Sequence, residues 1–167
     1  MRVFTETQRF NQWWLLLLLA LVAGIVLKAV YEETNGFKEA ENPLFILFII
    51  FAGLIPIGLL LGLQLQTRID PNGITVKFYP IGFTKKHFAW NEILECYVTK
   101  YSPLKDYGGW GIRGFGKKRA YTISGNVGIQ IVTVNNKQFL IGTRQPESVK
   151  TVIEIYRNKL NLNTHYL

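Results

Sequence analysis

The stretch WWLLLLLALVAGIVL, residues 13–27, and the stretch LFILFIIFAGLIPIGLLLGL, residues 44–63, decide how this chain is organised. Neither contains a charged residue. Extended to residues 13–30 and 43–65, they give helices of 18 and 23 residues. At ~1.5 Å of rise per residue these helices are about 27 and 34 Å long, which matches a hydrocarbon core of ~30 Å. The sequence therefore predicts a transmembrane helical hairpin over residues 1–65.

The charge distribution predicts the orientation of this hairpin. The loop at residues 32–42 has one Lys against four Glu, a net charge of −3. Residues 66–167 have 15 Lys and Arg against 6 Asp and Glu, a net charge of +9. Positive flanking segments tend to stay in the cytoplasm. We therefore expect a multi-pass protein of the inner, or cytoplasmic, membrane, with the N-terminus and the C-terminal domain cytoplasmic and the acidic loop outside.

Small residues recur at four-residue intervals in both apolar runs. Ala20 and Gly24 lie in the first run, and Gly58 and Gly62 lie in the second. Such spacing allows close approach of two helices. It favours either packing within the hairpin or contact between copies of the chain. Asp, Glu, His and Arg are absent from both runs, which indicates an anchor rather than a transporter.

From Leu65 onward the apolar periodicity changes to two, with turn residues at short intervals. This pattern is typical of a compact antiparallel β domain. Asp70-Pro-Asn-Gly73 predicts a hairpin turn, and Asn135-Asn136 predicts a second turn that requires positive φ. The sequence predicts about seven strands, at residues 65–69, 74–79, 86–90, 93–101, 121–123, 128–134 and 138–141.

The period changes again at Pro146, which suits the first position of a helix. Apolar residues then recur at helical spacing, at Val149, Val152, Ile153, Tyr156 and Leu160. This stripe predicts an amphipathic C-terminal helix that caps the β domain. The predicted fold class is thus a two-helix membrane hairpin (1–65) followed by a mainly-β cytoplasmic domain (66–167) with a C-terminal helix.

Three motifs in residues 64–159 resemble a known family. They are Ile69-Asp-Pro-Asn-Gly-Ile74, Phe88-Ala-Trp-Asn-Glu-Ile93 and Ile141-Gly-Thr-Arg-Gln-Pro-Glu147. The chain resembles bacterial membrane-anchored proteins in which a pleckstrin-homology-like (PH-like) domain follows two N-terminal transmembrane helices. The resemblance implies a fold and a location, and it carries over no catalytic residue.

The Gly-rich basic segment at residues 107–119 carries the main site hypothesis. Its glycines spell parts of two nucleotide-binding signatures, but no strand–helix unit follows them as those signatures require. One interpretation is a solvated connector. The other is a surface that faces anionic lipid headgroups, since cations near such a surface gain about 1 kcal/mol each and aromatic side chains insert into it. Its candidate residues are Trp110, Arg113, Phe115, Lys117, Lys118 and Arg119.

No catalytic, metal-ligating or cofactor-binding constellation is recognisable, and no nucleic-acid motif occurs. Cys96 is the sole cysteine, so no internal disulfide can form, and Lys85-Lys-His87 is interpreted as solubilising charge on an edge strand. We therefore expect no cofactor and no nucleic-acid partner. The predicted function is that of a non-enzymatic scaffold or adaptor that binds an unknown protein partner or forms a homo-oligomer. The alternatives are sensing of anionic lipid and, more remotely, a cryptic enzyme.

Overall fold

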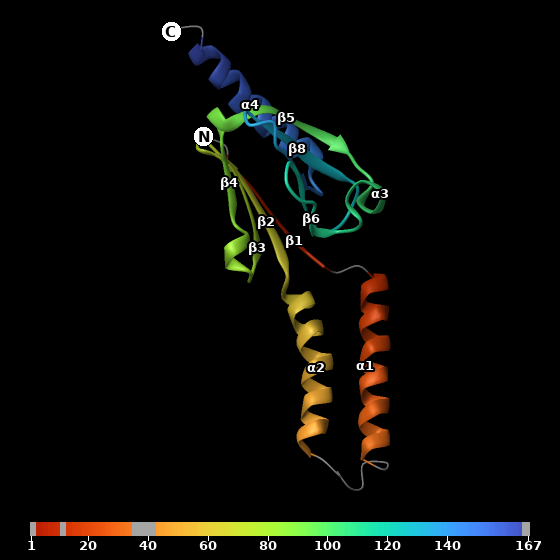
Figure 1. Cartoon of the computed structure of the whole chain (residues 1–167). Helices are drawn as coiled ribbons and strands as arrows, with labels where there is room; N and C mark the ends of the chain where they lie inside the picture. The colour runs from red at the N-terminus through yellow and green to blue at the C-terminus, as the bar shows by residue number, and fades with distance from the viewer. Residues whose placement is uncertain (1–2, 11–12, 35–42, 165–167) are drawn as a thin grey trace. The chain divides into compact units, whose positions relative to one another are not determined.

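The computed structural model describes residues 3–10, 13–34 and 43–164, without the side chains of residues 14, 15, 54, 56, 57, 60, 83 and 159–164. Within these ranges the chain has nine strands, four α-helices and two short 3-10 helices (Figure 1). It divides into a helical unit, Arg9–Leu63, and a β unit composed of Met1–Gln8 and Gln64–Leu167. In chain order the elements are β1 (Phe4–Arg9), α1 (Trp13–Glu33), α2 (Pro43–Gly62), β2 (Gln64–Asp70), β3 (Gly73–Tyr79), η1 (Gly82–Thr84), β4 (Lys86–Ala89), η2 (Trp90–Glu92), β5 (Ile93–Lys100), α3 (Pro103–Tyr107), β6 (Gly111–Arg113), β7 (Lys118–Thr122), β8 (Val127–Thr133), β9 (Gln138–Gly142) and α4 (Pro146–Thr164).

The β unit contains two sheets, a four-stranded sheet of order β1-β2-β3-β4 and a five-stranded sheet of order β5-β8-β9-β7-β6. The β2–β3 hairpin closes where Asp70 pairs with Gly73, as the sequence predicts. A Cβ atom at Gly73, whose φ is 144°, would collide with the carbonyl oxygen of Phe88 on β4. This position therefore requires glycine, because β4 approaches the β2–β3 turn too closely to leave room for a side chain. Asn136 has φ 54°, as expected for the Asn-Asn turn.

The predicted arrangement of about seven antiparallel strands is wrong in two respects. The described residues contain nine strands, and β7 pairs with β9 in parallel, with Ala120 opposite Leu140. The two strands that the sequence reading missed are β1, which lies ahead of the helical unit, and β6, which lies inside the Gly-rich segment. Three-residue β6 is too short to show a period of two, and only its pairing with β7 makes it a strand.

The core of the β unit lies between the two sheets and α4. Ring centroids of Phe88 on β4 and Phe139 on β9 are 4.7 Å apart, so side chains of the two sheets are in direct contact. Helix α4 begins at Pro146, as the sequence predicts, and Trp90 stacks on Tyr156 at 5.3 Å. Val149, Val152, Ile153 and Tyr156 of its apolar stripe are buried, whereas the side chain of Leu160 lies outside the described set. The fully buried aliphatic side chains are those of Leu65, Ile69, Ile74, Val76, Ile123, Ile129, Ile131, Leu140, Ile141 and Val149.

Strand β1 is joined to the second sheet through polar side chains that point inward. Glu6, which is 6% exposed, accepts hydrogen bonds from the Thr143 hydroxyl at 2.6 Å and the Arg144 main-chain N–H at 2.8 Å. Gln8 donates from Nε2 to the carbonyl oxygen of Gly142 at 2.8 Å. These contacts join residues more than 130 positions apart, so the first strand of the chain is an integral part of the β unit.

In the helical unit, α1 and α2 pack against each other at Gly53. A Cβ atom built there would collide with the side chain of Val26 on α1. The absence of a side chain at position 53 thus sets how closely the two helices approach. At the C-terminal end of α1, Lys28 and Glu32 form an ion pair at 3.7 Å.

Across residues 3–10, 13–34 and 43–164, no helix combines the length and the apolarity needed to cross a membrane. This finding contradicts the prediction of a transmembrane hairpin with spans at 13–30 and 43–65. It equally contradicts the predicted multi-pass location in the cytoplasmic membrane with both ends inside. The uncharged part of α1 ends before Lys28, and its 15 residues from Trp13 reach only about 22 Å.

Candidate functional site

The Gly-rich basic segment folds into a β-hairpin rather than an open loop. Strands β6 and β7 are antiparallel, with Arg113 opposite Ala120, and residues 114–117 form the tip. Gly114 has φ 84°, and a Cβ atom there would collide with the carbonyl oxygen of Lys118, so the tip needs glycine at this position. Phe115 is 94% exposed at the tip. A fully solvated phenylalanine on a defined turn is a candidate contact residue.

Three of the predicted residues tie this hairpin to neighbouring groups in the β unit. The Trp110 indole N–H donates to the carbonyl oxygen of Gly125 at 3.1 Å. Arg113 donates from Nε to the carbonyl oxygen of Trp110 at 3.0 Å. The Lys118 ammonium group lies 5.0 Å from the ring centroid of Tyr107, a cation–π distance. Three of the six predicted residues are therefore engaged within the fold.

The tyrosines beneath the hairpin stay neutral well above physiological pH. Burial, with a contribution from the charges of Asp106 and Tyr97, raises the pKa of Tyr107. Burial raises the pKa of Tyr101 to about 12, and its ring lies edge-on to Tyr107 at 6.2 Å. A neutral phenol keeps its aromatic face available to Lys118.

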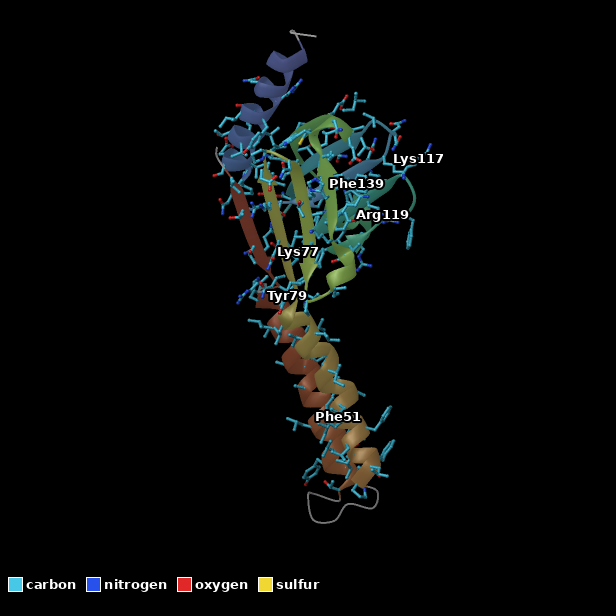
Figure 2. The ribbon with its side chains drawn as sticks, turned by 90° about the vertical axis from the view of Figure 1, so that its left-hand side faces the viewer. Phe51, Lys77, Tyr79, Lys117, Arg119 and Phe139 are labelled. Carbon is cyan, nitrogen blue, oxygen red and sulfur yellow. The ribbon has the colours of Figure 1, made fainter. Side chains whose placement is uncertain are left out.

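The remaining predicted residues of the segment project from the hairpin. Lys117 and Arg119 are exposed, and neither side chain forms a hydrogen bond or an ion pair with a described residue. Figure 2 shows both on the same side of the β unit, next to Phe139. Lys117, Arg119 and Phe115 make up what we call the tip surface, two available cations and one exposed aromatic side chain at and next to the turn.

The helical unit presents a second candidate surface, which we call the apolar helical surface. Large apolar side chains of both helices are exposed to an extent unusual for a folded protein; Leu17 is 61% exposed and Phe48 is 67% exposed. Figure 2 labels one of them, Phe51. The set comprises Trp13, Leu16, Leu17, Leu18, Leu21, Ile25, Leu27 and Tyr31 on α1, and Leu44, Phe45, Leu47, Phe48, Phe51, Ile55, Leu59 and Leu61 on α2.

The small residues singled out in the sequence lie away from the α1–α2 contact. Cβ atoms built at Gly24, Gly58 and Gly62 would each meet no heavy atom within 4 Å, and Ala20 is exposed. The structure does not bring them together; the close approach within the unit is at Gly53 instead. These positions are therefore open to an outside partner.

In the part of the chain that the structure describes, no three His, Cys, Asp or Glu side chains gather as metal ligands would. Cys96, on β5, is partly buried, and burial raises the pKa of its thiol to about 12 against the opposing charge of Arg157. A thiol with such a pKa is a poor nucleophile at neutral pH.

Sequence reasoning missed the part played by β1. Burial alternates along Phe4–Gln8, with buried residues at 4, 6 and 8, but Glu6 and Gln8 are polar. The sequence therefore shows no apolar period of two here, and these side chains are buried through the hydrogen bonds that they form with residues 142–144. The outward residues of β1, Thr5 and Thr7, complete a face of the four-stranded sheet.

Comparisons with protein-family models and with curated proteins find nothing that matches this chain. The resemblance to PH-like proteins therefore stays an expectation from the sequence.

Proposed function

We propose that this protein is a non-enzymatic assembly protein whose copies associate through the apolar helical surface. The observation that carries this proposal is the exposure of large apolar side chains all along α1 and α2. Soluble monomers rarely expose apolar patches larger than a few hundred Å², and a helix that is apolar on all sides is normally buried. Fully burying a side chain of this kind contributes roughly 1.5–3 kcal/mol, so burial of many of them strongly favours association of the copies.

A second copy of the helical unit suits this surface. Gly58 and Gly62 leave an open strip on α2, and Gly24 leaves one on α1. Small residues at such spacing let two helices approach closely and gain dispersion contacts. Because residues 13–27 and 44–63 carry no charge, no like-charge repulsion arises between these stretches themselves.

The test is the mass of the full chain, purified in a nonionic detergent and measured by light scattering before and after detergent removal. We expect a discrete oligomer without detergent that does not dissociate in high salt, because apolar contacts are not screened. Gly58→Leu should weaken this oligomer. Gly82→Leu is the matched control, because Gly82 is equally open but lies in the β unit. A monomer without detergent, or an assembly unaffected by Gly58→Leu, would overturn the proposal.

The tip surface supports a second candidate function, binding to an anionic lipid surface. Phe115 can insert its ring while Lys117 and Arg119 meet the headgroups, and each cation near such a surface is worth about 1 kcal/mol. We would measure partitioning of the full chain to anionic and to neutral vesicles and take the ratio, in which the contribution of the apolar helices cancels.

Neutralising Lys117 and Arg119 with glutamine should reduce this ratio about fivefold per residue at low salt. The control neutralises two exposed lysines elsewhere, Lys100 and Lys150. An equal loss in both variants would show that only overall charge matters and would refute a role for the tip surface.

A further inference from the structure

The outward face of the four-stranded sheet forms a polar hollow of ≈ 540 Å³ in the β unit. Figure 2 shows strands β1 to β4 side by side, with Lys77 and Tyr79 labelled on β3. The described residues that line it at outward strand positions are Thr5 and Thr7 on β1, Gln66, Arg68 and Asp70 on β2, Thr75 and Lys77 on β3, and His87 on β4, with Lys85 just before β4.

The strand register arranges these side chains in two rows across the sheet. In the first row Thr75 lies between Arg68 and His87. In the second row Gln66 lies opposite Lys77. Since Val76 pairs with Lys86, the preceding residue of the fourth strand, Lys85, comes next to Lys77 on its other side. The rows bring residues from three strands to one surface, and β1 adds two hydroxyl groups beside them.

The first row satisfies its own polar groups. Arg68 donates from Nε to Asp70 Oδ2 at 2.9 Å, and the hydroxyl of Thr75 lies 2.8 Å from Nδ1 of His87. Although burial alone would raise it, the hydrogen bonds from Arg68 and from the Asn72 main chain lower the pKa of Asp70. The Asp70 carboxylate is therefore charged and held by Arg68, and along β2 the first row separates Asp70 from Gln66 of the second row.

The second row carries two positive charges, those of Lys77 and Lys85, and no negative charge. Lys77 and Lys85 are both exposed, and neither forms a hydrogen bond or an ion pair with a described residue. Like charges facing each other on adjacent strands are destabilising. An anion that accepts from both ammonium groups at once would relieve this repulsion.

We propose that the outer face of the four-stranded sheet binds a small polyhydroxylated molecule bearing a phosphate monoester. Lys77 and Lys85 hold the phosphate, whose three terminal oxygens can accept from both lysines together. The hydroxyls of Thr5 and Thr7 and the amide of Gln66 exchange hydrogen bonds with the hydroxyls of the ligand. The hollow falls within the ~300–1,000 Å³ typical of small-molecule sites and is larger than phosphate alone requires. This site is distinct from both the apolar helical surface and the tip surface.

The test uses the full chain in nonionic detergent and titration calorimetry with glucose 6-phosphate, inorganic phosphate and glucose. We expect saturable binding of glucose 6-phosphate that is tighter than that of phosphate, with no heat from glucose. The double variant Lys77→Gln/Lys85→Gln should weaken binding by ~tenfold or more, because two charge-assisted hydrogen bonds are removed. The control Lys137→Gln/Lys150→Gln makes the same change in charge away from the sheet and should leave binding intact.

A further experiment uses vesicles containing phosphatidate. It distinguishes a lipid headgroup from a small soluble molecule as the source of the phosphate monoester. If the vesicles and glucose 6-phosphate both bind, and both need Lys77 and Lys85, the site accepts a phosphate monoester from either source. Vesicle binding without glucose 6-phosphate binding would overturn the small-molecule assignment. Absence of saturable binding to wild type, equal losses in both double variants, or equal affinity for phosphate and glucose 6-phosphate would also overturn the proposal.

Discussion

Replacing Glu6 by alanine should destabilise the β unit by about 3–5 kcal/mol. Glu6 is 6% exposed, and its carboxylate accepts from the Thr143 hydroxyl at 2.6 Å and the Arg144 N–H at 2.8 Å. Each hydrogen bond to a charged group is worth about 1.5–3 kcal/mol. Removing the acceptor leaves both donors without a hydrogen-bond partner. A domain of this size is stable by only about 5–15 kcal/mol, so the loss is a large fraction of the total.

The assay is urea unfolding of the full chain in nonionic detergent, followed by near-ultraviolet circular dichroism of the β unit. Glu6→Gln keeps an acceptor for one donor but turns an N–H₂ group toward the other, so it should cost about half as much. Thr5→Val is the matched control, since Thr5 faces outward on the same strand. If Glu6→Ala unfolds at the same urea concentration as Thr5→Val, β1 is not held by its inward carboxylate.

Four further predictions concern the glycines and the cysteine. Gly53→Leu should separate α1 from α2, seen as a lower helix melting temperature in detergent, whereas Gly58→Leu should leave that temperature unchanged, because only the first position faces the other helix. Gly114→Ala should cost more than ~1 kcal/mol, since it adds a collision to a strained φ, while Gly116→Ala carries the φ strain alone; urea unfolding distinguishes them. The Cys96 thiol, with a pKa of about 12, should resist alkylation at pH 8 until the chain is unfolded. Its raised pKa also means that the free energy of unfolding falls as pH rises from about 9 toward 12, since the unfolded chain loses that proton first, and Cys96→Ser should flatten the decline.

Local signals in the sequence were sufficient where a feature depends on neighbouring residues. The β2–β3 turn at Asp70–Gly73, the turn at Asn136 and the start of α4 at Pro146 all follow from residues with restricted backbone choices. The buried stripe of α4 follows from helical periodicity. These features stand where the sequence predicts them.

Features that depend on distant partners were missed or misplaced. Strand β6 exists through its pairing with β7, and the parallel β7–β9 pair joins residues about twenty positions apart. Gln8 and Gly142 meet across almost the whole chain. Nothing in the neighbourhood of these residues in the sequence specifies such contacts.

The candidate sites divide in the same way. The sequence by itself determined that residues 107–119 are basic and rich in glycine, and that residues 13–27 and 44–63 are apolar. Only the tertiary structure decided which residues of the segment 107–119 project from the fold. Trp110 and Arg113 are held by hydrogen bonds, while Phe115 is exposed. Only the strand order and register placed Lys77 beside Lys85 and brought both to the hollow that the threonines of β1 also line. The physical reason is that composition and periodicity act between near neighbours, whereas a binding surface is assembled by pairing between strands that are far apart in the chain.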